Sequence, residues 1–160
     1  MSFSLNRLAK SCYNAGTTKR IYYRARVQKL YLARVLNTGE HVEGVLIDSG
    51  QLARAAVDAA SDKKASDVIM LDIRDLTTIA DYFVICTGNN PRQINAIADA
   101  IDEQLREKRA RVLNREGIAE TGWVLLDFGD IIVHIFGPKE REYYRLERLW
   151  SEAKTVVYLQ

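Results

Sequence analysis

Acidic side chains are the first residues in this sequence whose spacing bears on catalysis. Nucleotidyl transfer uses metal ions held by carboxylates that project from one strand face, a pair that reads Asp-x-Asp. After residue 50 the only acids separated by one position are Glu140 and Glu142, which fall in a predicted helix where alternate side chains diverge. The other candidates are dispersed over different predicted elements: Asp72, Asp75, Asp81 and Asp127. A nucleotidyltransferase therefore stays an alternative that lacks its metal pair, and we expect no bound metal.

A second set of candidates lies in the run from Trp123 to His134. Asp127-Phe128-Gly129 matches the metal-binding tripeptide of protein kinases, but no Gly-rich loop, strand lysine or HRD segment accompanies it. We interpret it as a hairpin turn in which Gly129 adopts unusual backbone angles. His134 is the only histidine after residue 50. Because no Cys, Ser or second His lies near it in sequence, a structural strand histidine is preferred over a contact residue or a catalytic base.

The segment TGNNP, residues 87–91, precedes a predicted helix and raises the question of phosphate binding. It has neither the P-loop lysine nor the GxGxxG spacing, so we interpret it as a capped turn. Cys12 and Cys86 form no CxxC pair, which argues against a metal site or a disulfide framework and favours a reducing compartment. We expect no cofactor, no membrane span and no secretory signal.

Charge divides the chain into two parts. Residues 1–49 hold eight basic and three acidic side chains out of totals of 23 and 21, so residues 50–160 hold 15 and 18, a formal charge of −3. A net negative domain lacks the basic footprint of a protein that binds a phosphate backbone, so a basic protein partner suits it better than RNA. Residues 1–49 are interpreted as a basic arm, a transit peptide or an over-extended start, and the three stay open.

The elements that would position these residues follow from hydrophobic periodicity. Helical spacing from Gln51 predicts a helix to about Lys64, and two apolar runs, VIMLDIR (68–74) and DYFVICTG (81–88), predict strands. Asn90 before Pro91 marks the start of a second helix. WVLLDF (123–128) and IIVHIF (131–136) predict a hairpin, and a last helix is expected at about 139–153.

This order of helix, two strands, helix, two strands and helix predicts an α/β (α+β) fold. We expect a mixed sheet with helices packed mainly on one face, in one domain over residues 50–160. The other sheet face would then be available for a partner.

Aromatic and acidic residues near the predicted hairpin are the candidates for partner binding. Trp123 heads a strand, where an aromatic is either core or an interface anchor. Tyr143 and Tyr144 are adjacent on one helix, so one of the two should be exposed. The nearby acids are interpreted either as solvated loop residues or as contacts for a cationic partner: Glu116, Glu120, Asp127 and Asp130.

Over about 100 residues from Gln51 onward, the sequence resembles the ribosomal silencing factor family, also called Iojap-like. The most specific segments are these: Leu71-Asp72 followed by ADYFVICTG (80–88), Glu116-Gly117, WVLLDFGDIIVH (123–134), and REYYRLERLW (141–150) with Tyr144 in the tyrosine position. Asn89-Asn90 departs from the threonine or serine pair common in the family, and the long N-terminal segment is atypical of bacterial members, which adds weight to a start near Val42 or Val45.

The resemblance implies a factor that binds the large ribosomal subunit through its fourteenth protein, at the face that meets the small subunit. Docking there would block subunit joining and repress translation, while organelle members take part in large-subunit assembly. The family has no enzymatic activity, although its fold looks like that of nucleotidyltransferases without their acids. We expect cytoplasmic location, or a mitochondrion or plastid if residues 1–49 are a transit peptide, and homodimer formation is left open. The expected contact residues are Glu116, Trp123, Asp127, Asp130, Tyr143 and Tyr144.

Overall fold

The structure is a computed structural model that describes residues 48–160. Four helices and a short 3-10 turn are present in this part of the chain: α2 (Ser49–Asp62), α3 (Pro91–Glu107), η1 (Ala119–Thr121), α4 (Pro138–Tyr144) and α5 (Leu146–Leu149). The strands are β1 (Ser66–Asp72), β2 (Tyr82–Thr87), β3 (Asn114–Ile118), β4 (Trp123–Asp127), β5 (Ile131–Phe136) and β6 (Lys154–Leu159). The three interpretations of residues 1–49 concern positions that, apart from 48 and 49, lie outside the described residues.

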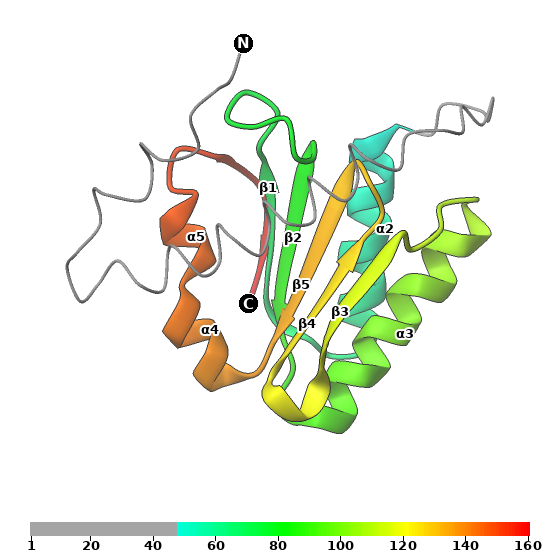
Figure 1. Cartoon of the computed structure of the whole chain (residues 1–160), viewed down its shortest axis with the longest axis vertical. Helices are drawn as coiled ribbons and strands as arrows, with labels where there is room; N and C mark the ends of the chain where they lie inside the picture. Colours follow the sequence, from blue (N-terminus) through cyan, green and yellow to red (C-terminus); the bar gives the residue numbers. More distant parts are fainter. Residues whose placement is uncertain (1–47) are drawn as a thin grey trace, which may run out of the picture. The chain divides into compact units, whose positions relative to one another are not determined.

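The six strands form one mixed sheet in the order β3-β4-β5-β2-β1-β6. Only β2 and β5 are parallel neighbours, and the other four pairs are antiparallel. Figure 1 shows α2 and α3 together on one side of this sheet and α4 and α5 on the other. The α+β fold and the mixed sheet predicted from the sequence are confirmed.

The main hydrophobic core lies between the sheet and the pair α2 and α3. Ile97, Ile101 and Leu105 form the buried stripe of α3, and each is 0% exposed. The start of α3 is the predicted capped turn, since the Asn90 side chain accepts a hydrogen bond of 2.9 Å from the Gln93 backbone N–H. Burial of the alternate residues of β4 and β5 against these helices fixes which face the remaining strand residues occupy.

The opposite sheet face is partly covered by α4 and α5, which corrects the expectation that it is open to a partner. The Tyr144 ring lies 5.9 Å from that of Phe136, and the Trp150 ring lies 5.2 Å from that of Phe83. Leu146 is 0% exposed between these two contacts. An aromatic sheet face of this size is too apolar to be left to water, and the chain folds its own helices onto it.

Three details of the predicted element order are wrong. The polar stretch before Trp123 contains strand β3, and residues 154–159 form strand β6. The single helix expected at 139–153 is two short helices, because Arg145 adopts a left-handed conformation with φ of 46° between them. Its side chain stabilises the turn by donating to the Glu142 carbonyl at 3.1 Å and by an ion pair with the Glu142 carboxylate.

The segment Asp127-Phe128-Gly129 is a hairpin turn, as predicted. The Asp127 carboxylate accepts a hydrogen bond of 2.7 Å from the Gly129 backbone N–H, and Gly129 has a φ of 93°. Phe128 N–H donates to the Ile131 carbonyl at 3.0 Å and closes the loop. Asp127 is therefore committed to the turn between β4 and β5.

Candidate functional site

Four aromatic rings gather on the sheet face that carries α4, and we call them the aromatic cluster: Trp123, His134, Phe136 and Tyr144. Trp123 stacks on Phe136 with 5.2 Å between ring centroids and lies 4.7 Å from Tyr144. His134 lies 6.0 Å from both Trp123 and Phe136. Ring pairs at such separations stabilise each other beyond the area that they bury, so the four rings pack as one unit.

Strand register places these rings side by side. Trp123 pairs with Phe136 across β4 and β5, and Leu125 pairs with His134. Paired residues in an antiparallel ladder share a face. The side chains of these two pairs, Trp123 with Phe136 and Leu125 with His134, therefore all project away from α2 and α3. Tyr144, the last residue of α4, adds its ring from above.

A close backbone approach supports the cluster at the β3–β4 turn. Gly117 has a φ of 81°, and a Cβ there would lie 2.1 Å from the Trp123 carbonyl oxygen. A Cβ on Gly122, whose φ is 72°, would lie 2.2 Å from a carboxylate oxygen of Glu140. The positive φ favours glycine at both positions, and at Gly117 a Cβ would also collide with the Trp123 backbone, so the pairing of β3 with Trp123 depends most on Gly117.

The two adjacent tyrosines differ in exposure, as predicted from their adjacency. Tyr143 is 51% exposed, whereas Tyr144 is half-buried against Trp123. Their rings meet edge to face at 5.0 Å. Tyr143 is thus the outer member of a series of ring contacts that continues through Tyr144 to Trp123 on the sheet.

Trp123 is only 5% exposed and belongs to the packed interior of this face. Its role as a direct interface anchor remains a prediction. Ile118, which sequence reasoning missed, pairs with Trp123 across β3 and β4 and is 59% exposed. A large apolar side chain so exposed beside an aromatic cluster is a contact candidate. No pattern in the sequence points to Ile118, because β3 is a mostly polar edge strand.

The predicted acids lie at different distances from the aromatic cluster. Glu116 pairs with Leu125 on the same sheet face and accepts a hydrogen bond from the Asn114 side chain at 3.1 Å. Asp127 is 6% exposed and serves the hairpin turn. It lies at the far end of β4 from Trp123, about 13 Å away at the usual rise of a strand. Asp130 is exposed in that same distant turn. Of these three acids, Glu116 is therefore the nearest to the cluster.

Three further candidates from the sequence are the turn at residues 87–91, His134 and Cys86. The Gln93 side chain accepts from the Asn89 N–H at 2.8 Å and donates to the carbonyls of Lys63 and Lys64, which fills the turn before α3. His134 is fully buried. Burial raises the pKa of the Cys86 thiol to about 12, so this thiol is uncharged at neutral pH.

The dispersed carboxylates engage neighbours of their own. Arg74 ion-pairs with Asp72 at 2.6 Å, and its hydrogen bond lowers the pKa of that carboxyl. The Ser49 hydroxyl donates to Asp81 at 2.7 Å. Among residues 48–160 no group of three or more His, Cys, Asp or Glu side chains is placed to hold a metal ion. None of the described helices is long and apolar enough to cross a membrane.

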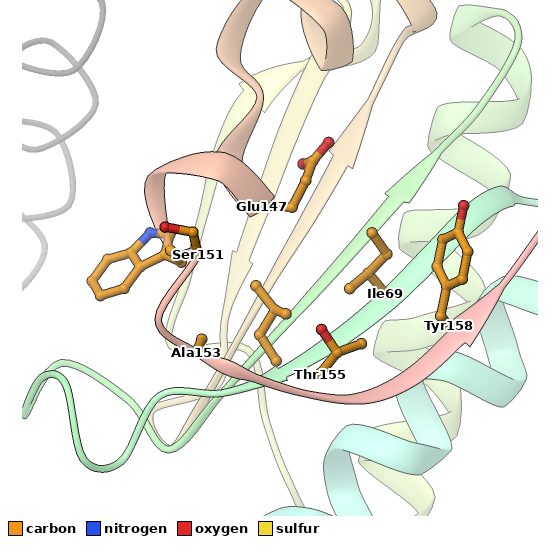
Figure 2. Close-up of a pocket in the computed structure, with 8 residues that line it drawn as sticks. Ile69, Glu147, Ser151, Ala153, Thr155 and Tyr158 are labelled. Carbon is orange, nitrogen blue, oxygen red and sulfur yellow. The ribbon is translucent and has the colours of Figure 1, made fainter.

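A cavity of about 250 Å³ lies on the sheet face that carries α4 and α5, near β6 (Figure 2). Ile69 and Leu71 of β1 line it together with Trp150 and Glu147 from the α5 region and with Thr155 and Tyr158 of β6. Its lining is mainly apolar, and it is small for a ligand site.

Comparison with known proteins identifies relatives over the same residues. The sequence model described as "Ribosomal silencing factor during starvation" matches residues 47–160. Ribosomal silencing factor RsfS of Bacillus subtilis is 44% identical over 102 residues, which cover 64% of this chain and 86% of that protein. The RsfS of Halalkalibacterium halodurans is 42% identical over 106 residues, covering 66% and 91%.

A solved structure supports the same assignment. The crystal structure of a protein from Chromobacterium violaceum superposes with a TM-score of 0.63 at 32% identity, covering 69% of this chain and 94% of that one. Sequence and fold therefore agree over the whole described domain. The chain belongs to the ribosomal silencing factor family.

Proposed function

We propose that this protein binds the large ribosomal subunit through its fourteenth protein and blocks association with the small subunit. Family membership supports a ribosomal partner and a role in silencing translation. On this proposal the protein acts by steric exclusion and not by catalysis. It works in the compartment of its ribosomes, the cytoplasm, or in an organelle if residues 1–49 direct it there.

The observation that supports this choice of surface is the exposed Tyr143, whose ring meets Tyr144 of the aromatic cluster edge to face. Tyrosine at the rim of a packed aromatic cluster is typical of residues that dominate binding energy, because little side-chain entropy is lost on contact. Ile118 extends the exposed apolar surface from the other side of Trp123. We assign Tyr143 and Ile118 as apolar contacts, with Tyr144 and Trp123 behind them.

Acidic residues supply the second part of the proposed contact. Glu116 lies on the same face as the cluster, while Asp127 and Asp130 lie near the β4–β5 turn. A basic ribosomal protein would meet Glu116 and the exposed Asp130, which would speed encounter and fix register more than they would add affinity, while the buried Asp127 holds the turn that carries Asp130.

A subunit-joining experiment tests this function. Purified large subunits are incubated with the full chain, small subunits are added, and the products are separated by sedimentation. We expect the protein to migrate with large subunits and the joined fraction to fall as protein is added. Normal joining, with no protein in the large-subunit fraction, would refute the proposal. Adding the protein after joining distinguishes exclusion from active dissociation.

A further inference from the structure

Arg141 is a buried cation to which no role has been given so far. It belongs to α4 and is 8% exposed. Burial of a guanidinium is unfavourable unless its N–H groups find partners, so the partners of Arg141 show what the residue holds in place.

Those partners lie on three different elements. One terminal nitrogen donates to the Asp67 carbonyl in β1 at 3.1 Å, and the other donates to the Thr87 hydroxyl at the end of β2 at 3.5 Å. The Nε atom lies 3.3 Å from a carboxylate oxygen of Glu147 in α5. Figure 2 shows the Glu147 carboxylate directed away from Ile69 and Thr155, which line the cavity. Arginine suits such a site because its planar fork donates in several fixed directions.

The ion pair crosses the break between the two helices. Arg141 lies in α4 and Glu147 in α5, on either side of Arg145 with its left-handed backbone. The angle at that break decides where Tyr144 and Trp150 point. Tyr144 reaches Trp123 at 4.7 Å, and Trp150 reaches Phe83 at 5.2 Å.

We propose that Arg141, through Glu147, Thr87 and Asp67, is the positioning residue that holds α4 and α5 so that the two tyrosines form a binding surface. This inference rests on the proposed function, since it assigns the geometry of the same site. Arg141 is buried, with its partners on β1, β2 and α5, and acts on binding only through the placement of the tyrosines.

The test uses the full chain with the substitutions Arg141→Lys and Glu147→Gln. Arg148→Lys and Glu152→Gln are the matched controls, because both residues are exposed in the same region. Lysine keeps the charge but lacks the planar fork, so it cannot donate to the Asp67 carbonyl and the Thr87 hydroxyl while lying beside the Glu147 carboxylate. We expect Arg141→Lys and Glu147→Gln to lower affinity for purified large subunits at least about fivefold, and the controls to change it less than about twofold. Unchanged affinity in both test variants would overturn the proposal.

A double-substitution cycle separates positioning from general stability. In a Tyr144→Ala background, Arg141→Lys should lower affinity by less than about a further twofold. An equal loss in both backgrounds would show that Arg141 does not act through Tyr144.

A spectroscopic readout keeps the test independent of ribosome binding. The chain has two tryptophans, so two indole N–H signals are expected in a nitrogen-correlated NMR spectrum. Arg141→Lys should move the signals of both Trp150 and Trp123, while Arg148→Lys should move neither. If the unmodified protein fails to bind large subunits, the proposed function fails by itself. A folded Arg141→Lys variant with unmoved Trp123 and Trp150 signals would then refute the positioning role.

Discussion

The ring of Tyr144 lies 4.7 Å from the ring of Trp123, with an angle of 46° between their planes. This contact joins a residue at the end of α4 to the first residue of β4, so the aromatic cluster depends on tertiary folding and not on one segment. It also explains why Tyr143, its exposed neighbour, is held at a fixed position over the sheet.

Trp123→Ala should mainly affect stability. Because the side chain is 5% exposed, we expect a loss of about 3–5 kcal/mol in the free energy of unfolding, the usual cost of truncating a buried tryptophan. Urea denaturation followed by circular dichroism measures it. Trp123→Phe is the control and should recover most of the loss. An alanine variant as stable as the unmodified protein would show that Trp123 is not part of the core.

Gly117→Ala should destabilise the pairing of β3 with β4. The residue has a φ of 81°, and its new Cβ would meet the Trp123 carbonyl oxygen. We expect a loss of more than about 1 kcal/mol by thermal or urea denaturation. Gly50→Ala is the matched control, since its Cβ would meet nothing closer than 3.4 Å and it lies in α2. The control should be neutral or stabilising by up to about 1 kcal/mol. Equal effects in the two variants would contradict the close approach.

Cys86 should resist alkylation, and its thiol should lose its proton only at high pH. Burial raises its pKa from 9.0 to about 12, so about one thiol in ten thousand is ionised at pH 8. A Cys12→Ser variant isolates the signal, and a thiol reagent should modify it at pH 8 only after unfolding. The neutral thiol contributes stability in full below pH 9, and this contribution is lost as the pH rises toward 12. Rapid labelling of the folded variant would show that the thiol is accessible.

Glu116→Gln should slow association with large subunits by about twofold to tenfold, with a smaller effect on dissociation. The effect should shrink as salt rises, because exposed charges are screened. Association kinetics at two salt concentrations test it, with Glu103→Gln on the helix-covered side as the control. Identical rates for the two variants would exclude Glu116 from the contact.

The parts of the fold that the sequence predicted are those with strong local signals. Asn90 before Pro91 marks a helix start because its side chain caps the Gln93 N–H. Apolar runs of six residues predict β2 and β5 because their residues are buried on both faces. The hairpin turn followed from Gly129 between two such runs.

The parts that were missed depend on tertiary contacts. Strand β3 is polar and half exposed, so only its pairing with β4 makes it a strand. No glycine or proline lies at the helix break at Arg145, so the sequence does not predict the break. The left-handed backbone of Arg145 is held by Glu142, and the helices on either side are joined by the ion pair of the buried Arg141 with the partly exposed Glu147. For the same reason Ile118 and Arg141 could not be selected as site residues, whereas Tyr143 and Tyr144 could.

The affinity of Tyr143→Ala for purified large subunits tests the central claim most directly. Tyr158→Ala on β6 is its matched control, since Tyr143 is 51% exposed and Tyr158 is 52% exposed. Both variants should fold with stabilities within about 0.5 kcal/mol of the unmodified protein. We predict that Tyr143→Ala weakens binding at least about fivefold, or roughly 1 kcal/mol, and that Tyr158→Ala leaves it unchanged. Equal affinity for both variants would contradict the assignment of the aromatic face as the ribosome-binding surface.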